Sequence, residues 1–163
     1  MPASIVAESE MFYNQFEPLM KHRFIMYLDG IPTYLIRKAS RPTVTQEAKE
    51  LPHINLSRYV AGKAKWAPIQ MTLYDPVAPS GAQAVIEWFR LHHEAVTGRN
   101  GYADFYKKDI VMNMLGPVGD KVQEWILRGC IITEINFGDA DWSTDELAEI
   151  SLTVQPDFCL LNF

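Results

Sequence analysis

The chain has 163 residues and a mass of 18.6 kDa, which suits one domain, since a single core typically serves roughly 100 to 200 residues. Hydrophobic residues make up 48% and charged residues 21%, so the chain can bury a core and is not a disordered linker. The 15 Lys and Arg are outnumbered by 20 Asp and Glu, and the net charge of −5 argues against a basic nucleic-acid clamp. We expect a single domain over residues 1–163.

The chain begins with a segment that has no clear period. Residues 1–20 mix acidic with scattered apolar residues, and we expect an arm or a short helix there. The aromatic and branched residues of 23–27 favour a strand. The dipeptide Asp29-Gly30 is a two-residue turn signal. We therefore expect a β-hairpin whose second strand lies within residues 31–40.

Residues 41–64 form a long excursion in which Pro42 and Pro52 interrupt the pattern and no apolar period is sustained. We expect weak or edge-like strand content. A connection longer than about 12 to 15 residues in a compact domain is usually functional or disordered. Between residues 37 and 65 only Glu47 and Glu50 are acidic, whereas the basic residues are Arg37, Lys38, Arg41, Lys49, Arg58, Lys63 and Lys65.

The next elements are a strand at 66–75 and one amphipathic helix at 80–97. Ser80 is placed to cap the helix and Gly98 to end it. The residues that recur at helical spacing along one face are Ala82, Val85, Ile86, Phe89, His93 and Val96.

Three strand candidates follow at 106–115, 121–137 and 146–159, separated by Gly-rich turns and an acidic loop. The order is strands, one helix, then strands, without the strand-helix-strand repeat of a parallel sheet. We therefore expect a mainly β fold, an antiparallel β-barrel or sandwich with one flanking α-helix.

The last two strand candidates predict which side chains share a face. In 121–137 one face carries Trp125, Leu127, Ile131, Ile135 and Phe137, and the other carries Glu124, Arg128, Cys130 and Glu134. In the last strand Ile150, Leu152 and Val154 alternate with the polar residues Glu149, Ser151, Thr153, Gln155 and Asp157. The chain after Arg128 holds seven acidic residues and no Lys or Arg, so charge is segregated along the sequence.

No enzyme or metal motif stands out. The P-loop, GxGxxG, HExxH and GxSxG patterns are all missing. The acidic loop partly matches a calcium template, but Thr144 stands where Gly must turn the chain and Ile150 where a bidentate Glu is needed. His92 and His93 are adjacent on the helix and cannot grip one metal together. We expect no catalytic site, no metal and no cofactor.

The remaining composition argues against a membrane or disulfide-rich protein. The longest uncharged run, residues 76–86, is far shorter than the roughly 20 apolar residues of a membrane helix, and the start lacks the layout of a secretory signal. Only Cys130 and Cys159 are available for a disulfide, too few for a scaffold. We expect reduced thiols, while a link between them or to a neighbouring copy stays open.

From Trp66 onward the order and spacing of several motifs resemble a known family. The motifs are WAPIQMTLYDP, AVIEWF, YADFYKKDIVMNML and VQEWILRGCIITEINFGDADWSTDELAEISLTVQPD. Over residues 24–157 the chain is similar to the tail tube proteins of contractile-tailed bacteriophages, which are related in fold to the type VI secretion ring protein and to pyocin-type tubes. Trp142 departs from the Tyr that the resemblance suggests.

The resemblance implies a structural protein rather than an enzyme. It implies homo-hexameric rings stacked into a tube inside a contractile sheath, with double-stranded DNA passing through the bore. The partners would be the sheath, baseplate and tail terminator proteins, in a virion tail assembled in the host cytoplasm. A tube initiator or terminator, or a secretion-type ring protein, would share these patterns, and a monomeric ligand-binding β-barrel is the alternative from another class.

Two sets of residues are candidate sites on this interpretation. Opposite charge between the long excursion and the acidic loop would set the register between rings, and the base-free polar face of the last strand would line the bore. The inter-ring candidates are Lys49, Arg58, Lys63, Lys65, Asp139, Asp141, Asp145 and Glu146. The lumen-facing candidates are Glu149, Ser151, Thr153, Gln155 and Asp157.

Overall fold

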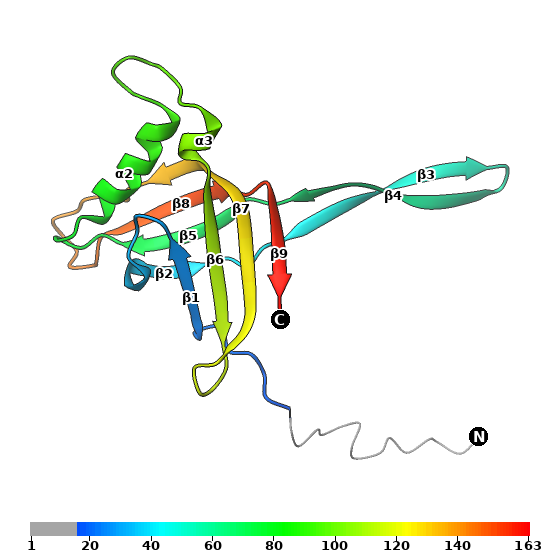
Figure 1. The fold of residues 1–163 in the computed structure, drawn as a ribbon, viewed down its shortest axis with the longest axis horizontal. Coiled ribbons are helices and arrows are strands. Elements are labelled where there is room, and N and C mark those ends of the chain that lie inside the picture. Colours follow the sequence, from blue (N-terminus) through cyan, green and yellow to red (C-terminus); the bar gives the residue numbers. More distant parts are fainter. Residues whose placement is uncertain (1–15) are drawn as a thin grey trace.

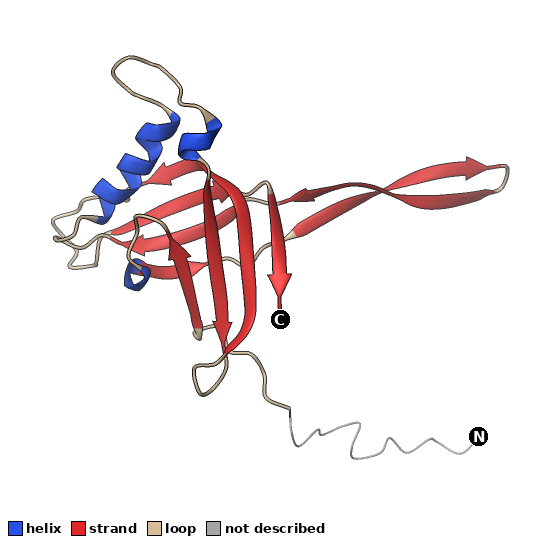
Figure 2. Ribbon diagram, viewed as in Figure 1, coloured by secondary structure: helices blue, strands red, loops and turns tan. Residues whose placement is uncertain are grey.

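A computed structural model describes residues 16–163. Of the arm or short helix expected at residues 1–20, residues 1–15 lie outside this described part, and residues 16–20 form no regular element. The fold is mainly β and antiparallel with one main helix, as the sequence predicted (Figures 1 and 2). No helix in residues 16–163 combines the length and apolar character needed to cross a membrane.

The body is one seven-stranded antiparallel sheet that folds over on itself, and β7 (Lys121–Asn136) belongs to both halves. The first half of β7 pairs with β6 (Lys108–Leu115) and β9 (Phe158–Asn162), and β6 pairs in turn with β1 (Phe24–Leu28). The second half pairs with β8 (Glu149–Gln155), followed by β5 (Ile69–Tyr74) and β2 (Ile36–Ala39). We call these the first and the second half-sheet.

The core lies between the two half-sheets and is almost entirely aliphatic and sulfur-containing. Leu28, Ile110, Leu127 and Cys159 stand opposite one another across the first half-sheet and are buried. Met71 and Leu152 are a similar buried pair across the second. No charged or polar residue within 16–163 is fully buried, so burial of apolar surface is the main stabilising contribution to this fold.

Strand β7 changes half-sheets at a bulge around Gly129, whose φ of +63° favours glycine. The extra residue shifts the alternation, so that Leu127, Cys130 and Ile132 are the buried positions. The predicted face assignment for 121–137 was therefore wrong just beyond the bulge, where Cys130 is buried, and at Phe137, which is exposed. A second bulge between Ile132 and Glu134 restores the alternation, so that Ile135 packs against the core as predicted.

The predicted hairpin of residues 23–40 was also wrong. Asp29-Gly30 does turn the chain, and an isolated bridge joins Leu28 and Ile31 across the turn. However, β1 and β2 pair with different strands and not with each other. Ile31 and Leu35 are buried, and the short 3-10 helix η1 (Thr33–Leu35) redirects the chain into the second half-sheet.

Residues 41–64, predicted to hold weak strand content, instead contain most of a long regular hairpin. It consists of β3 (Val44–His53) and β4 (Leu56–Trp66), which pair along their whole length except at one bulge. Figure 1 shows the hairpin projecting away from the body. Cross-strand hydrogen bonds between β3 and β4 form without an apolar period, and Pro52 is tolerated beside the tip.

The main helix α2 (Gly81–His92) begins as predicted, because the Ser80 hydroxyl accepts the Gln83 N–H at 3.3 Å. It ends at His92, well before the predicted end at 97. Val85 and Trp88 are buried, whereas Val96 is 93% exposed in the following loop. A one-turn helix, α3 (Ala103–Tyr106), precedes β6. The single last strand predicted at 146–159 is two strands, β8 and β9, which are separated at Pro156-Asp157.

Candidate assembly surfaces

The β3–β4 hairpin presents two different faces, which follow from its register. Directly opposed residues of an antiparallel pair point to the same side, and successive residues alternate. The cross-strand pairs Lys49–Val60, Leu51–Arg58 and His53–Leu56 therefore define one face, which we call the basic face. The other face of this outer part carries Ala48, Glu50, Pro52, Ser57, Tyr59 and Ala61.

The basic face combines positive charge with exposed aliphatic side chains. Leu51, directly opposite Arg58, is 51% exposed, and Leu56, opposite His53 near the tip, is 74% exposed. Every residue of β3 is exposed, so no element of residues 16–163 covers the hairpin. An isolated two-stranded hairpin is only marginally stable in water, and this one gains a packed face only by contacting another molecule.

The two other basic candidates lie nearer the body. Lys65 stands opposite Thr45, on the same side of the hairpin as the basic face. Lys63 lies in the bulge of β4, next to Gly62. A Cβ added to Gly62 would lie 2.6 Å from the Glu47 carbonyl oxygen. That close approach of the two backbones explains a glycine at this position.

The acidic candidates lie together in the loop between β7 and β8, residues 137–148, which we call the acidic loop. It too combines charge with exposed apolar side chains, since Trp142 is fully exposed and Leu147 is 74% exposed. The Asp141 carboxylate accepts hydrogen bonds from the N–H and the hydroxyl of Ser143 at 2.9 and 2.8 Å, which lower its pKa. No trio of metal-ligating side chains gathers within residues 16–163.

The acidic loop and the hairpin tip lie at opposite ends of the molecule along its longest axis (Figure 1). The two surfaces therefore cannot meet within one chain. Their charges are opposite, and each adds exposed apolar side chains to its charge. Such a pair of complementary, non-identical surfaces is what a head-to-tail contact between identical copies requires.

The polar residues of β8 share the outer face of the second half-sheet. Ser151 stands between Thr72 of β5 and Asn136 of β7, and Thr153 is opposite Gln70. The predicted alternation in β8 is confirmed, since Ile150, Leu152 and Val154 are the buried set.

The ends of this polar row are tied to other groups. Glu149 pairs with Arg37, and the Gln155 amide donates to the Trp66 carbonyl at 2.9 Å. Asp157 lies beyond the end of β8, outside the row. The outer face of the first half-sheet carries one apolar row, with Tyr27, Val111, Ile126 and Leu160 in line across four strands. The next row on that face is mostly polar, with Asn113, Glu124 and Asn162.

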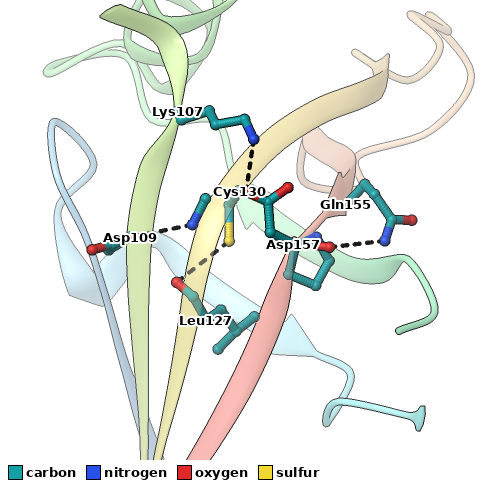
Figure 3. Close-up of polar contacts among 8 residues, drawn as sticks. Lys107, Asp109, Leu127, Cys130, Gln155 and Asp157 are labelled. Atoms are coloured by element: carbon teal, nitrogen blue, oxygen red, sulfur yellow. Dashed lines mark hydrogen bonds and ion pairs between the residues drawn. The ribbon is translucent and has the colours of Figure 1, made fainter. Parts of the chain in front are cut away.

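A group of polar contacts lies where β7 changes half-sheets (Figure 3). Lys107 Nζ lies 2.7 Å from Asp157 Oδ2. Asp109 accepts the Gly129 N–H at 3.1 Å and pairs with Arg128. The Gly129 N–H, with help from the guanidinium, lowers the pKa of Asp109, and hydrogen bonding to Asp157 raises the pKa of Lys107.

This corner brings together three motifs that carried the resemblance, YKKD, WILRG and the Asp157 position. The amino-acid sequence does not reveal the pairing, because Lys107 and Asp157 are 50 positions apart. No local pattern signals a pairing at that separation. The corner contacts lie where β7 passes from the first half-sheet to the second, next to the end of the polar row.

Two partly buried polar contacts hold helix α2, one to α3 and one to β7. Trp88 Nε1 donates to the Tyr106 carbonyl at 2.8 Å. His92 Nε2 lies 3.1 Å from the Ile132 N–H, which it accepts, so its Nδ1 carries the proton and donates to the Trp88 carbonyl. Burial lowers the pKa of His92, which keeps the imidazole neutral.

Both cysteines are free thiols in the core. Burial raises the pKa of Cys130 to about 12, with a contribution from nearby Cys159, and raises that of Cys159 to about 11. Thiols of such high pKa are poor nucleophiles, since the thiolate is the reactive form. Neither cysteine is placed for catalysis.

Comparisons with known proteins identify the fold. No family model matches the chain, and no curated protein is similar to it in sequence. The fold is similar to a chain of the cap that terminates the anti-feeding prophage tube, with a TM-score of 0.74 and 17% identity, covering 90% of this chain and 92% of that one.

Two further solved structures agree. A chain of the PVC sheath–tube complex, from an extracellular contractile injection system, matches with a TM-score of 0.72 and 14% identity, covering 97% of this chain and 99% of that one. The SPP1 tail tube matches with a TM-score of 0.56 and 15% identity, covering 89% and 79%. These are structural assemblies rather than enzymes. The chain therefore has the fold of the tube proteins of phage tails and contractile injection systems.

Proposed function

We propose that this chain is a structural subunit of a phage tail tube, whose copies close into hexameric rings that stack inside a contractile sheath. The observation that carries the proposal is the placement of the basic face and the acidic loop at opposite ends of the long axis. A head-to-tail contact of this kind generates either a closed ring or an open filament. A tube of stacked rings grows in both ways, by closure around each ring and by addition along the tube axis.

The basic face of one copy contacts the acidic loop of a copy in the next ring in this proposal. Lys49, Arg58, Lys63 and Lys65 oppose Asp139, Asp141, Asp145 and Glu146, as the charges suggest. Each exposed pair contributes only about 0 to 1 kcal/mol, so the charges mainly set register and encounter rate. Burial of aliphatic and aromatic side chains supplies most of the affinity, at about 1.5–3 kcal/mol for a fully buried Leu.

The polar outer face of the second half-sheet lines the bore in this arrangement. Glu149, Ser151, Thr153 and Gln155 form its base-free row on β8, and Asp157 lies at the margin in its pair with Lys107. Lys38, opposite Thr72 at the edge of this face, is a cation without an ion-pair partner in residues 16–163, whereas Arg37 is paired with Glu149. A wall with few such cations binds the phosphates of passing double-stranded DNA only weakly. The tube would connect a baseplate to a tail terminator in the virion tail, after assembly in the host cytoplasm.

A tube terminator is the second candidate, favoured by the similarity to the anti-feeding prophage cap. A terminator uses one of the two complementary ends and leaves the other for a different partner. The main tube subunit uses both. The number of rings that the purified chain stacks therefore distinguishes the two functions: a main tube subunit should stack many rings, and a terminator should not.

Exchange of charge between the two surfaces tests the proposed contact. The variants Lys49→Glu/Arg58→Glu and Asp139→Lys/Asp141→Lys should each reduce assembly, and their equimolar mixture should restore mixed assemblies, as measured by sedimentation and negative-stain electron microscopy. Ala48→Glu, on the opposite face of the hairpin, is the matched control and should assemble normally. Normal assembly of either double variant alone, at both low and high salt, would remove the contact from the proposal.

A further inference from the structure

The two edge strands of the folded sheet, β1 and β2, leave a gap between them that we call the seam. Strand β1 pairs only with β6, and β2 pairs only with β5, so each has one edge that no strand of residues 16–163 occupies. Two hollows lie along this seam, of about 520 and 280 Å3. Open strand edges offer unpaired N–H and C=O groups that an extended segment can bind.

The larger hollow has an apolar floor and a basic rim. Phe24, Met112 and Met114 form the floor together with Leu19. The rim consists of Lys21, His22, Arg37, Lys38 and Arg41, and no acidic residue lines the hollow.

Part of this rim is already engaged and part is free. Arg37 pairs with Glu149, and Arg41 donates to Gln123 at 3.1 Å. Lys21 and Lys38 have no ion-pair partner among residues 16–163. The hollow therefore suits an occupant that is extended, apolar and negatively charged.

One segment of the chain has this composition. Residues 1–15, which precede the described part, contain Glu8 and Glu10 and neither Lys nor Arg. They also supply the apolar residues Ile5, Val6, Met11 and Phe12. Charge and apolar character both complement the hollow.

The path of the described chain indicates which copy supplies the segment. Leu19 and Lys21 close one end of the hollow, and Figure 1 shows residues 16–20 running from there away from β1 and β2. A chain leaving in this direction leads away from its own seam. Fully extended, 15 residues span at most about 50 Å, enough to reach an adjacent copy.

We propose that residues 1–15 of a neighbouring copy bind in the seam between β1 and β2, with Glu8 and Glu10 against Lys21 and Lys38 and the apolar residues over Phe24 and the methionines. The segment adds to an open strand edge and joins subunits through backbone as well as side-chain contacts. This inference depends on the proposed function in one respect: it requires that copies of the chain assemble.

Zero-length cross-linking of isotopically mixed assemblies tests the proposal. The full chain is prepared with natural nitrogen and with nitrogen-15, mixed before assembly, treated with a carbodiimide and analysed by mass spectrometry. We expect links from Glu8 or Glu10 to Lys21 or Lys38, with about half of them joining a light and a heavy peptide. Links confined to peptides of one isotope would show that the segment folds back on its own chain, and would overturn the proposal.

Charge variants separate this inference from the proposed function. Glu8→Lys/Glu10→Lys should lower the yield of assemblies by at least several-fold, and the added changes Lys21→Glu/Lys38→Glu should recover most of it. Glu17→Lys, just outside the segment, is the control and should have little effect. Tubes that form with no link between the segment and the seam would overturn this inference and leave the proposed function intact, whereas a chain that never assembles would overturn both.

Discussion

The carboxylate of Asp157 occupies the space that a β-carbon on Gly129 would need. An added Cβ would lie 2.8 Å from the Asp157 Cγ, and it would also sit on a backbone with φ of +63°. Two separate constraints therefore require glycine at the point where β7 passes between the half-sheets.

Replacing this glycine should destabilise the fold markedly. We expect Gly129→Ala to lower the free energy of unfolding by about 2–4 kcal/mol, because a left-handed residue other than glycine costs about 1–2 kcal/mol and overpacking costs about 1–3 kcal/mol. Urea unfolding followed by circular dichroism measures the change. Gly119→Ala is the matched control, since φ is +86° there but nothing lies within 4 Å of an added Cβ. It should lose only the stability that the left-handed backbone conformation costs. Equal losses in the two variants would contradict the role of Asp157.

Stability should depend on pH through His92. Its pKa is lowered in the folded state, so the unfolded chain takes up a proton first as pH falls below about 6.5. The stabilising contribution is complete above that pH and is lost as pH falls toward the folded pKa. Protonation removes the acceptor of the Ile132 N–H, which loosens α2.

The variant His92→Phe keeps the ring that stacks on Tyr106 but cannot accept the Ile132 N–H. At pH 7.5 it should be less stable by about 1–3 kcal/mol, because a buried donor is left unsatisfied. Its stability should also change less than that of the unmodified chain between pH 7.5 and 5. His53→Gln, at the exposed tip of the hairpin, should keep the original pH profile. An unchanged profile in His92→Phe would show that another group carries the dependence.

The two thiols should be inert in the folded protein. With the pKa of Cys130 at about 12, the thiolate is about one part in ten thousand at pH 8, and burial slows access further. We expect a disulfide reagent to label Cys130 and Cys159 slowly in native buffer, and both rapidly in denaturant. Fast labelling of the native chain, or a disulfide on a non-reducing gel, would contradict this.

Sequence analysis predicted those elements whose signals are local and repetitive. The alternation in β8 and the Ser80 cap of α2 are each visible within a few residues, and both are present. The antiparallel class followed from the order of strands and helix. The resemblance then supplied the tube fold, which composition alone does not indicate.

The failures have a common physical origin in contacts between distant residues. Asp29-Gly30 predicted a turn, but burial of Ile31 and Leu35 in the core decides which strand comes next. One extra residue near Gly129 reversed the predicted faces of β7 as far as a second bulge between Ile132 and Glu134. The basic face of the hairpin depends on cross-strand register, which charge counting along the chain does not provide.

The state of association of the purified chain tests most directly whether it builds its structure with identical copies. Sedimentation velocity over a concentration series, with negative-stain electron microscopy of the same samples, gives both mass and shape. The account predicts rings with a central hole or tubes stacked from them. A stable monomer that persists at the highest concentrations would contradict it.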